Sequence, residues 1–261
     1  MEYRHLEVER RGRVAVVTFN RPEKANALNS RHIEEIEHAA LSFREDAETR
    51  AVVFAGAGKH FTSGADLTEP EPAPPTLVMH RRRRRIGQRA INALREMDQI
   101  TIAAWRGAAM GGGACIATAL DFRIGARDCF MSYPEINIGV NLMWSSLPLL
   151  VRLVGPSRAK QLVMGGERAA GPRLLEWGVL DEMVDGHRVM ARALAWAEHY
   201  ASRPPVAAQM IKRSVNVISS ALDGAVMHAD FDQHLLAAAT EDAAEAVDAW
   251  LAGREPTFEG R

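Results

Sequence analysis

Strand-like and helix-like segments alternate through the first half of the chain, and this alternation restricts the possible folds more than any other feature. Apolar residues recur at helical spacing from His32 to Phe43, behind Asn29 or Ser30 as a capping residue, and small residues typical of a helix fill Ala114–Leu120. The segments that read as strands are short, apolar and bounded by turn residues: Val14–Phe19, Ala51–Ala55, Thr101–Trp105 and Phe122–Ala126. Alternating strands and helices predict an α/β fold with crossover helices.

The second half, from about Ser145 onward, reads almost entirely as helix. Thr240-Glu241-Asp242 is a typical helix start, in which a capping hydroxyl is followed by acidic side chains in the first turn. Glu69–Pro75 holds four prolines in seven residues and therefore predicts a loop or the edge of a lid. We expect a strand-rich core packed against a helical tail.

The composition of the 261-residue chain is ordinary for a soluble globular protein, with 47% hydrophobic and 25% charged residues. Lys and Arg total 32 against 33 Asp and Glu, so the net charge of −1 argues against general binding to nucleic acid or to an anionic membrane. Cys115 and Cys129 are too few for a disulfide framework. Together with the charged start at Met1–His5, which predicts no signal peptide, they indicate a cytoplasmic protein. The longest apolar stretch, Ala108–Leu120, is shorter than the ~20 residues of a membrane span.

Sequence motifs of several cofactor and hydrolase classes are absent. Gly58-Lys59 has Val53 and His60 where a P-loop needs glycine and a hydroxyl residue. Gly111-Gly112-Gly113 has Ile116 where a dinucleotide-binding fingerprint needs its last glycine. No G-x-S-x-G elbow occurs, and the nine histidines form no H-E-x-x-H motif. These absences argue against nicotinamide, nucleotide-hydrolysing, zinc and serine-hydrolase chemistry.

Four segments that follow or border the strand-like runs carry the strongest functional signal. They are Arg21–Leu28 (RPEKANAL), Phe61–Leu67 (FTSGADL), Gly107–Gly113 (GAAMGGG) and Tyr133–Gly139 (YPEINIG). In this combination the chain resembles the enoyl-CoA hydratase/isomerase family, also called the crotonase family, over nearly its whole length through Gly253–Phe258. The resemblance implies a crotonase-like ββα spiral core in residues 1–199, for acyl-CoA binding and catalysis, and a C-terminal helical trimerisation region in residues 200–261.

A glycine triplet at the start of a helix is suited to binding an oxyanion. It has no Cβ atoms to block a ligand, and the first N–H groups of the helix are unpaired at the positive end of its dipole. Gly64-Ala65 offers a further N–H group from a tight turn after a strand. Two such groups aimed at one oxygen stabilise the enolate that forms when a proton leaves the α-carbon of a thioester. The resemblance assigns these roles to the N–H groups of Ala65 and Gly112, whereas the alternative for the glycines is close helix–strand packing.

Glu135 is the candidate acid/base group. Its apolar neighbours, among them Met131, Tyr133 and Ile138, are expected to raise the pKa of its carboxyl group toward a catalytically useful value. An arbitrary glutamate more often lies on a surface loop, and the family resemblance at this position favours the catalytic role.

The chain departs from the hydratase pattern of the family in two segments. Hydratases carry a glutamate two residues past the glycine triplet, where this chain has Cys115, and a neutral thiol is a weak acceptor for water. They also have a glycine-rich stretch after the second glutamate, where this chain has the bulky Met143 and Trp144. The alternative interpretation of these three residues is that they belong to the core.

A single carboxylate suits a double-bond shift better than a hydration. Glu135 alone can take a proton from C2 of a 3-enoyl-CoA and return it to C4, as the resemblance to monofunctional isomerases of the family implies. We therefore favour isomerisation of 3-enoyl-CoA to 2-enoyl-CoA over hydration of 2-enoyl-CoA. A dienoyl-CoA isomerase is rejected, because Cys115 and Met143 occupy the places of its further acids. A non-catalytic acyl-CoA carrier and a lyase or decarboxylase on a non-fatty acyl-CoA stay open as alternatives.

By resemblance, the CoA part of the acyl-CoA substrate lies across Arg21–Leu28 and Ala65–Leu67, and neither a metal nor a separate cofactor is expected. The predicted catalytic and substrate-binding residues are Lys24, Ala25, Ala27, Ala65, Asp66, Leu67, Gly111, Gly112, Cys115, Glu135, Met143 and Trp144. Arg21 and Lys24 are the candidates for phosphate contacts, and Arg254 and Phe258 are expected to reach the CoA of a neighbouring subunit.

The remaining expectations concern assembly. Arg81–Arg85 form the strongest charge run, which spreads around a helix and predicts a solvated face or pairing between subunits. Apolar residues in the tail, such as Leu235, Leu236, Val247 and Trp250, predict subunit contacts, so that we expect a homotrimer or a dimer of trimers.

Overall fold

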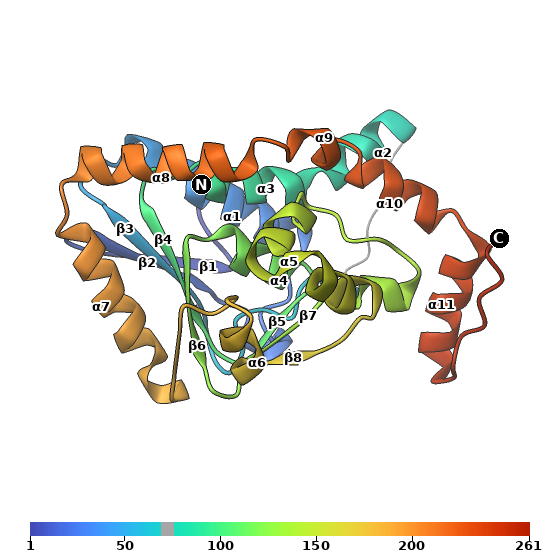
Figure 1. Ribbon diagram of the computed structural model, residues 1–261. Coiled ribbons are helices and arrows are strands. Elements are labelled where there is room, and N and C mark those ends of the chain that lie inside the picture. The colour runs from blue at the N-terminus through green and yellow to red at the C-terminus, as the bar shows by residue number, and fades with distance from the viewer. Residues whose placement is uncertain (69–75) are drawn as a thin grey trace.

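The computed structural model describes residues 1–68 and 76–261, which form two sheets surrounded by helices (Figure 1). In the larger sheet β1 is antiparallel to β2, and all other neighbouring strands are parallel. Its strands, in spatial order, are β1 (Leu6–Arg11), β2 (Val14–Phe19), β3 (Ala51–Gly56), β4 (Ile100–Trp105), β6 (Phe122–Ala126) and β9 (Glu182–Val184). The smaller sheet consists of β5 (Ala108–Met110), β7 (Phe130–Ser132) and β8 (Ala169–Ala170).

The helices follow the strands and then continue into a helical C-terminal region. They are α1 (Ser30–Ser42), α2 (Leu77–Arg84), α3 (Ile86–Arg95), α4 (Gly112–Ala119), α5 (Leu147–Met164), α6 (Gly171–Glu176), α7 (Val189–Ala201), α8 (Pro205–Ser220), α9 (Gly224–Met227), α10 (Asp230–Ala238) and α11 (Glu241–Ala252). Short 3-10 turns are η1 (Pro22–Lys24), η2 (Phe43–Glu45), η3 (Pro134–Ile138) and η4 (Gly186–Arg188). In Figure 1, α8 runs along the top and α9 and α10 lead to the far right, where α11 lies.

Each turn of the spiral passes from the larger sheet into a second layer and then into a helix. Strand β4, for example, is followed by β5 and then by α4. In the preceding turn, Thr62 pairs with Ala109 of β5 in a parallel bridge, and Leu28 of the turn before pairs in the same way with Ala65. Consecutive turns therefore stack in register, and the second-layer segments of neighbouring turns lie side by side.

The elements predicted from apolar patterning are confirmed. All four predicted strands are present as β2, β3, β4 and β6, buried as expected from their composition. Helix α1 begins after Asn29, whose side chain accepts a hydrogen bond of 2.8 Å from the His32 N–H group. Helix α11 begins after Thr240, whose hydroxyl accepts from the Ala243 N–H group at 3.1 Å. The expected ββα spiral with a helical C-terminal region is what the structure contains.

Several features differ from the expectations or lie beyond them, among them the short strands β5 and β7, which the sequence did not predict. Strand β1 is absent from the prediction because its sequence, LEVERR, is mostly charged, and it forms an exposed edge paired through Val8 and Val17 with β2. The second half is not all helix, since β8 and β9 are short strands added to the two sheets. The proline-rich Glu69–Pro75 lies outside the described residues. Over residues 1–68 and 76–261, no helix is both long and apolar enough to cross a membrane.

Candidate active site

Two backbone amides at the ends of neighbouring spiral turns are free to bind a ligand. Leu28 donates to the Gly64 carbonyl at 2.8 Å and accepts from the Asp66 N–H group at 3.0 Å, so the Ala65 N–H group points to the opposite side of its strand. Gly112 is the first residue of α4, where a helix leaves its N–H groups unpaired. Within the described ranges, neither the Ala65 nor the Gly112 N–H group has a hydrogen-bond acceptor.

Glycines bring these two amides together. Gly64 has a φ of +86°, and a methyl group on it would overlap the Met110 carbonyl oxygen and lie 3.5 Å from the Gly112 nitrogen. Gly111 has a φ of +47°, which turns the chain from β5 into α4. Any side chain at Gly64 would therefore push the Ala65 segment away from α4. The two amides in question belong to Ala65 and Gly112, the residues predicted to bind an oxyanion.

The Glu135 carboxylate lies over Gly111. Glu135 sits in η3, after Pro134, and its Oε1 atom would be 2.7 Å from a methyl group placed on Gly111. Its Oε2 atom is buried and has no hydrogen-bond partner among the described residues. Burial raises the pKa of the Glu135 carboxyl group to about 7, partly offset by a backbone hydrogen bond within the residue. Such a group is half ionised near neutral pH, as a general acid/base requires.

Cys115 stands in the first turn of α4, and its thiol is buried and uncharged. Its Sγ atom lies 4.0 Å from the Met143 carbonyl oxygen. Burial, and next the charge of Glu135, raise the pKa of the Cys115 thiol well above its ordinary range. The thiol therefore stays protonated and supplies neither a base nor a strong anchor for water.

Trp144 is held against the glycines of two helices by an unusual turn. A methyl group on Gly112 of α4, or on Gly87 of α3, would overlap its indole ring. Trp144 and Ser145 both have a left-handed backbone, with φ of +70° and +56°. Such backbone costs on the order of 1–3 kcal/mol per residue and persists only where the surroundings impose it.

These groups line one cavity of about 500 Å³. The predicted residues that it contains are Ala65, Leu67, Gly112, Cys115, Glu135, Met143 and Trp144. It does not include the predicted Lys24, Ala25, Ala27, Asp66 and Gly111, although Gly111 lies directly beneath the Glu135 carboxylate.

Ten further residues line the cavity, and the sequence did not predict them as part of the site. These additional residues are Arg84, Ile138, Val140, Asn141, His234, Ala238, Ala243, Ala244, Val247 and Asp248. Those after residue 230 belong to α10 and α11. Helix α11 reaches the cavity because Gly139 has no side chain, and a methyl group there would lie 2.6 Å from the Ala243 Cα atom. No local signal connects that glycine with a helix about one hundred residues later.

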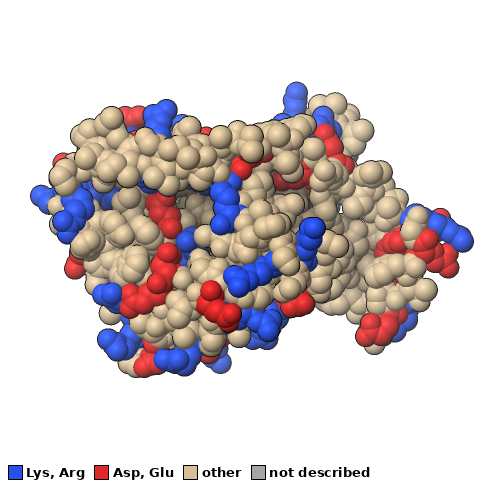
Figure 2. All heavy atoms as spheres, in the orientation of Figure 1, with Lys and Arg blue, Asp and Glu red and all other residues tan. Residues whose placement is uncertain are grey.

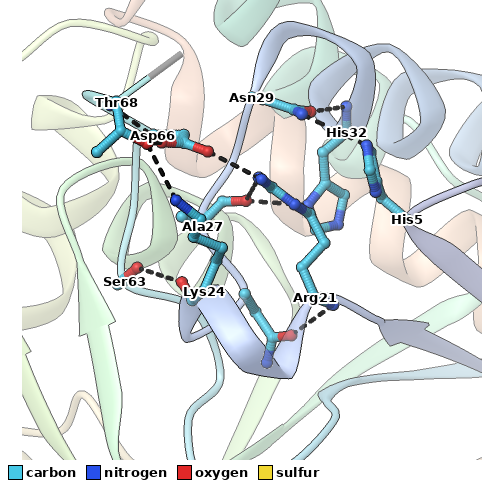
Figure 3. Close-up of polar contacts among 10 residues, drawn as sticks. His5, Arg21, Lys24, Ala27, Asn29, His32, Ser63, Asp66 and Thr68 are labelled. Atoms are coloured by element: carbon cyan, nitrogen blue, oxygen red, sulfur yellow. Dashed lines mark hydrogen bonds and ion pairs between the residues drawn. The ribbon is translucent and has the colours of Figure 1, made fainter.

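An ion pair between Arg21 and Asp66 fixes the Arg21–Leu28 loop, as Figure 3 shows. Arg21 binds Asp66 at 2.9 Å and the Ala27 carbonyl oxygen at 2.6 Å, and both charged side chains are largely buried. Hydrogen bonds to Thr68 lead the effects that lower the pKa of the Asp66 carboxyl group, and Arg21 lowers it further. This placement ties the loop to the Ala65 segment and does not leave Arg21 open for phosphates.

Lys24 keeps an exposed position beside the same segment, where its Nζ atom donates to the Thr68 hydroxyl at 3.3 Å. Ala25 and Asn26 have left-handed backbone, and the Asn26 side chain fixes the turn by accepting from the Arg21 N–H group at 2.9 Å. Asn26 also donates to the carbonyl oxygens of Ala57 and His60. Sequence reasoning gave this asparagine no role.

The arginine run and the C-terminal tail make contacts within the chain. Arg81 binds Asp232 of α10 at 2.9 Å, so at least one arginine of the run connects α2 to the C-terminal helices. Arg254 pairs with Glu245 of α11, and Phe258 is about half exposed. In the part of the chain that the structure describes, no cluster of His, Cys, Asp or Glu has the form of a metal site.

Comparison with known proteins shows which family the chain belongs to. A profile of the enoyl-CoA hydratase/isomerase family matches residues 9–261. The short-chain-enoyl-CoA hydratase of Clostridium acetobutylicum is 33% identical over 83% of this chain and 82% of its own length. The 1,2-epoxyphenylacetyl-CoA isomerase of Escherichia coli is 27% identical over 95% of both chains. A crystal structure of an enoyl-CoA hydratase/isomerase from Pseudoalteromonas atlantica superimposes with a TM-score of 0.87 at 25% identity, covering 98% of this chain and 100% of that one.

Proposed function

Because the chain belongs to the enoyl-CoA hydratase/isomerase family, we propose that it moves the double bond of a 3-enoyl-CoA into conjugation, with Glu135 as its single acid/base group. The proposal rests on two groups in one cavity, the buried Glu135 carboxylate, whose Oε2 atom has no hydrogen-bond partner among the described residues, and the neutral thiol of Cys115. Asp248, the other carboxylate that lines the cavity, is exposed, and one buried carboxylate is suited to moving a proton between two carbons of one substrate.

The reaction conserves all atoms of the substrate. Ionised Glu135 removes a proton from C2, and the electron pair spreads over the thioester oxygen and the C3–C4 double bond as a dienolate. The N–H groups of Ala65 and Gly112 stabilise the charge on that oxygen, and losing one such donor typically costs about 3–4 kcal/mol of transition-state stabilisation. Glu135 then returns the proton to C4, which leaves the double bond between C2 and C3 and restores the carboxylate.

Hydration of a 2-enoyl-CoA is the second candidate, and the name of the Clostridium acetobutylicum relative favours it. Hydration needs a water molecule held and activated beside C3. Here Cys115 is a poor acceptor, while Met143 and Trp144 occupy the adjoining wall of the cavity. These three residues support isomerisation over hydration.

The test is turnover of two isomeric substrates by the same protein. We expect 3-butenoyl-CoA to be converted to 2-butenoyl-CoA, followed by the ultraviolet absorbance of the conjugated thioester, and 2-butenoyl-CoA to be hydrated far more slowly. Glu135→Gln should abolish the conversion, whereas Glu176→Gln, a change at an exposed residue of α6, should not. Ordinary enzymatic hydration by the wild type would contradict isomerisation, and tight binding of both thioesters without turnover would indicate a carrier.

We further propose that the CoA part lies along the Lys24–Ala27 turn and the Asp66–Leu67 segment, of which the exposed Leu67 lines the cavity. Lys24 then meets the phosphates, while Asp66 and Arg21 hold the loop in shape. The thioester brings all the chemistry that the reaction needs, so no further cofactor is required. Full activity after dialysis against a metal chelator would support this point.

Assembly as a homotrimer or dimer of trimers is supported by an apolar face of α8. In Figure 2 the surface along this helix is largely uncharged. Its exposed apolar residues are Val206, Met210, Ile211, Val215, Val217 and Ile218. A surface of this kind is typical of subunit contacts. Light scattering that gives a monomer mass would contradict the assembly.

The two free, buried cysteines support a cytoplasmic location.

A further inference from the structure

We infer that the indole of Trp144 is the specificity-determining group that restricts the site to acyl groups about as short as the four carbons needed for the double-bond shift. This inference rests on the proposed function, because it takes the thioester to lie at Ala65 and Gly112. It adds the class of substrate, a short-chain acyl-CoA, and names the residue that selects it.

The position of the ring follows from two glycines. Gly112 and Gly87 belong to different helices, and a methyl group on either would overlap the indole. The ring therefore fills the gap between α3 and α4 beside the amide that we assign to the thioester oxygen. Trp144 is 7% exposed and lines the cavity next to Met143. An acyl chain that continues along this wall beyond C4 meets the ring instead of open space.

The turn that carries the ring is fixed from the C-terminal region. The Ser145 N–H group donates to the Asp230 carboxylate at 2.6 Å, and the Gln88 side chain of α3 donates to the other oxygen of the same carboxylate. Asn141 adds a hydrogen bond of 3.3 Å to the Asp230 carbonyl oxygen. A buried carboxylate from α10 thus holds two consecutive left-handed residues, Trp144 and Ser145, in place. These hydrogen bonds fix the backbone from which the indole extends, and Gly87 and Gly112 pack against the ring itself.

The physical consequence is that binding affinity stops increasing with the length of the acyl chain. Burying one additional methylene in an apolar site tightens binding by about fourfold. In the wild type the affinity should stop increasing near butyryl-CoA, because further methylenes remain outside the apolar part of the cavity. In Trp144→Ala, the space vacated by the ring should accommodate about two further methylenes. Hexanoyl-CoA should then bind ~15-fold more tightly than butyryl-CoA.

The experiment measures the affinity of the purified full-length protein for acetyl-, butyryl-, hexanoyl- and octanoyl-CoA by calorimetry. These saturated thioesters do not react by double-bond shift, so binding is separated from catalysis. Trp144→Ala is compared with wild type and with Trp250→Ala, a matched control at an exposed tryptophan of α11 that does not line the cavity. Trp144→Leu, which is smaller than tryptophan but keeps an apolar side chain, is the second variant should the alanine protein fail to fold.

We expect wild type and Trp250→Ala to share one chain-length profile that flattens after butyryl-CoA, and the Trp144 variants to prefer hexanoyl-CoA. Asp230→Ala should shift the chain-length profile in the same direction, because Asp230 positions the turn that carries the ring. If Asp230 only stabilised the fold, its replacement would leave the profile unchanged. Equal profiles in wild type and the Trp144 variants, or a wild-type affinity that keeps rising to octanoyl-CoA, would overturn the inference. Failure of the wild type to bind any of the four thioesters would instead overturn the proposed function.

Discussion

Replacing Glu135 with glutamine should raise the free energy of unfolding above that of the wild type at alkaline pH. At acidic pH the two proteins should be almost equally stable. The carboxyl group is buried, its Oε2 atom has no partner among the described residues, and its pKa rises from an ordinary 4.5 to about 7. Glutamine has nearly the same shape and cannot ionise. The substitution therefore isolates the free-energy cost of holding a charge at this position.

The sign and size of the effect follow from proton linkage. Below pH 4.5 the carboxyl group is protonated in both the folded and the unfolded protein, so its ionisation costs nothing. Between pH 4.5 and pH 7 the unfolded chain loses its proton first, and the fold loses stability as pH rises. Above pH 7 the group is ionised in both states and the full cost is present. At 1.36 kcal/mol per pKa unit, a rise from 4.5 to about 7 corresponds to about 3 kcal/mol.

The assay is urea unfolding of wild type and Glu135→Gln at a fixed protein concentration between pH 4.5 and pH 8.5, since assembly makes stability depend on concentration. The stability difference between the two proteins should grow by about 3 kcal/mol across this range. Glu176→Gln, at an exposed position, controls for the general effect of removing one negative charge. A difference that stays constant with pH would refute the assignment of Glu135 as a buried carboxyl group that titrates near neutrality.

Four further outcomes are expected. The kcat/KM of wild type for 3-butenoyl-CoA should rise with pH and level off above about 7, as Glu135 ionises, and a rate independent of pH from 5 to 9 would contradict its role as base. Cys115→Glu should raise the rate of 2-butenoyl-CoA hydration by about 100-fold, whereas an unchanged rate would assign the limit to Met143 and Trp144. Gly64→Ala should lower kcat by about 100-fold, because the methyl group overlaps the Met110 carbonyl oxygen and displaces the neighbouring amide, and normal kcat in a folded variant would exclude that amide from catalysis. Arg21→Ala should destabilise the protein by about 1–3 kcal/mol in urea unfolding, since the largely buried Asp66 carboxylate loses its charged partner and keeps only the hydrogen bonds from Thr68, and an unchanged stability would show that the pair is not structural.

Local signals in the sequence were sufficient for the parts of the fold that local physics decides. Asn29 and Thr240 mark helix starts because each needs only a side-chain oxygen three residues before an N–H group. The glycines that allow the Ala65 and Gly112 segments to approach, and the apolar surroundings of Glu135, are also visible as short patterns.

Long-range pairings account for what the sequence did not reveal. From the sequence, Arg21 is an unpaired cation in a loop. Its partner Asp66 is distant in the sequence, and no residue near Arg21 predicts the ion pair. Strand β1 is mostly charged and is a strand because β2 supplies its hydrogen bonds. The wall formed by α10 and α11 depends on Gly139 and Asp230, whose contacts lie far along the chain.

In the proposed mechanism, two amides bind the thioester oxygen while one carboxyl group faces the neighbouring carbon. A crystal structure of Glu135→Gln with 3-butenoyl-CoA tests this arrangement, because the inactive variant retains the unreacted substrate. We predict the thioester oxygen at about 2.7–3.1 Å from both the Ala65 and the Gly112 nitrogens, with the substituted side-chain amide at position 135 beside C2. An oxygen directed away from these nitrogens, or a side chain at position 135 remote from C2, would contradict this arrangement.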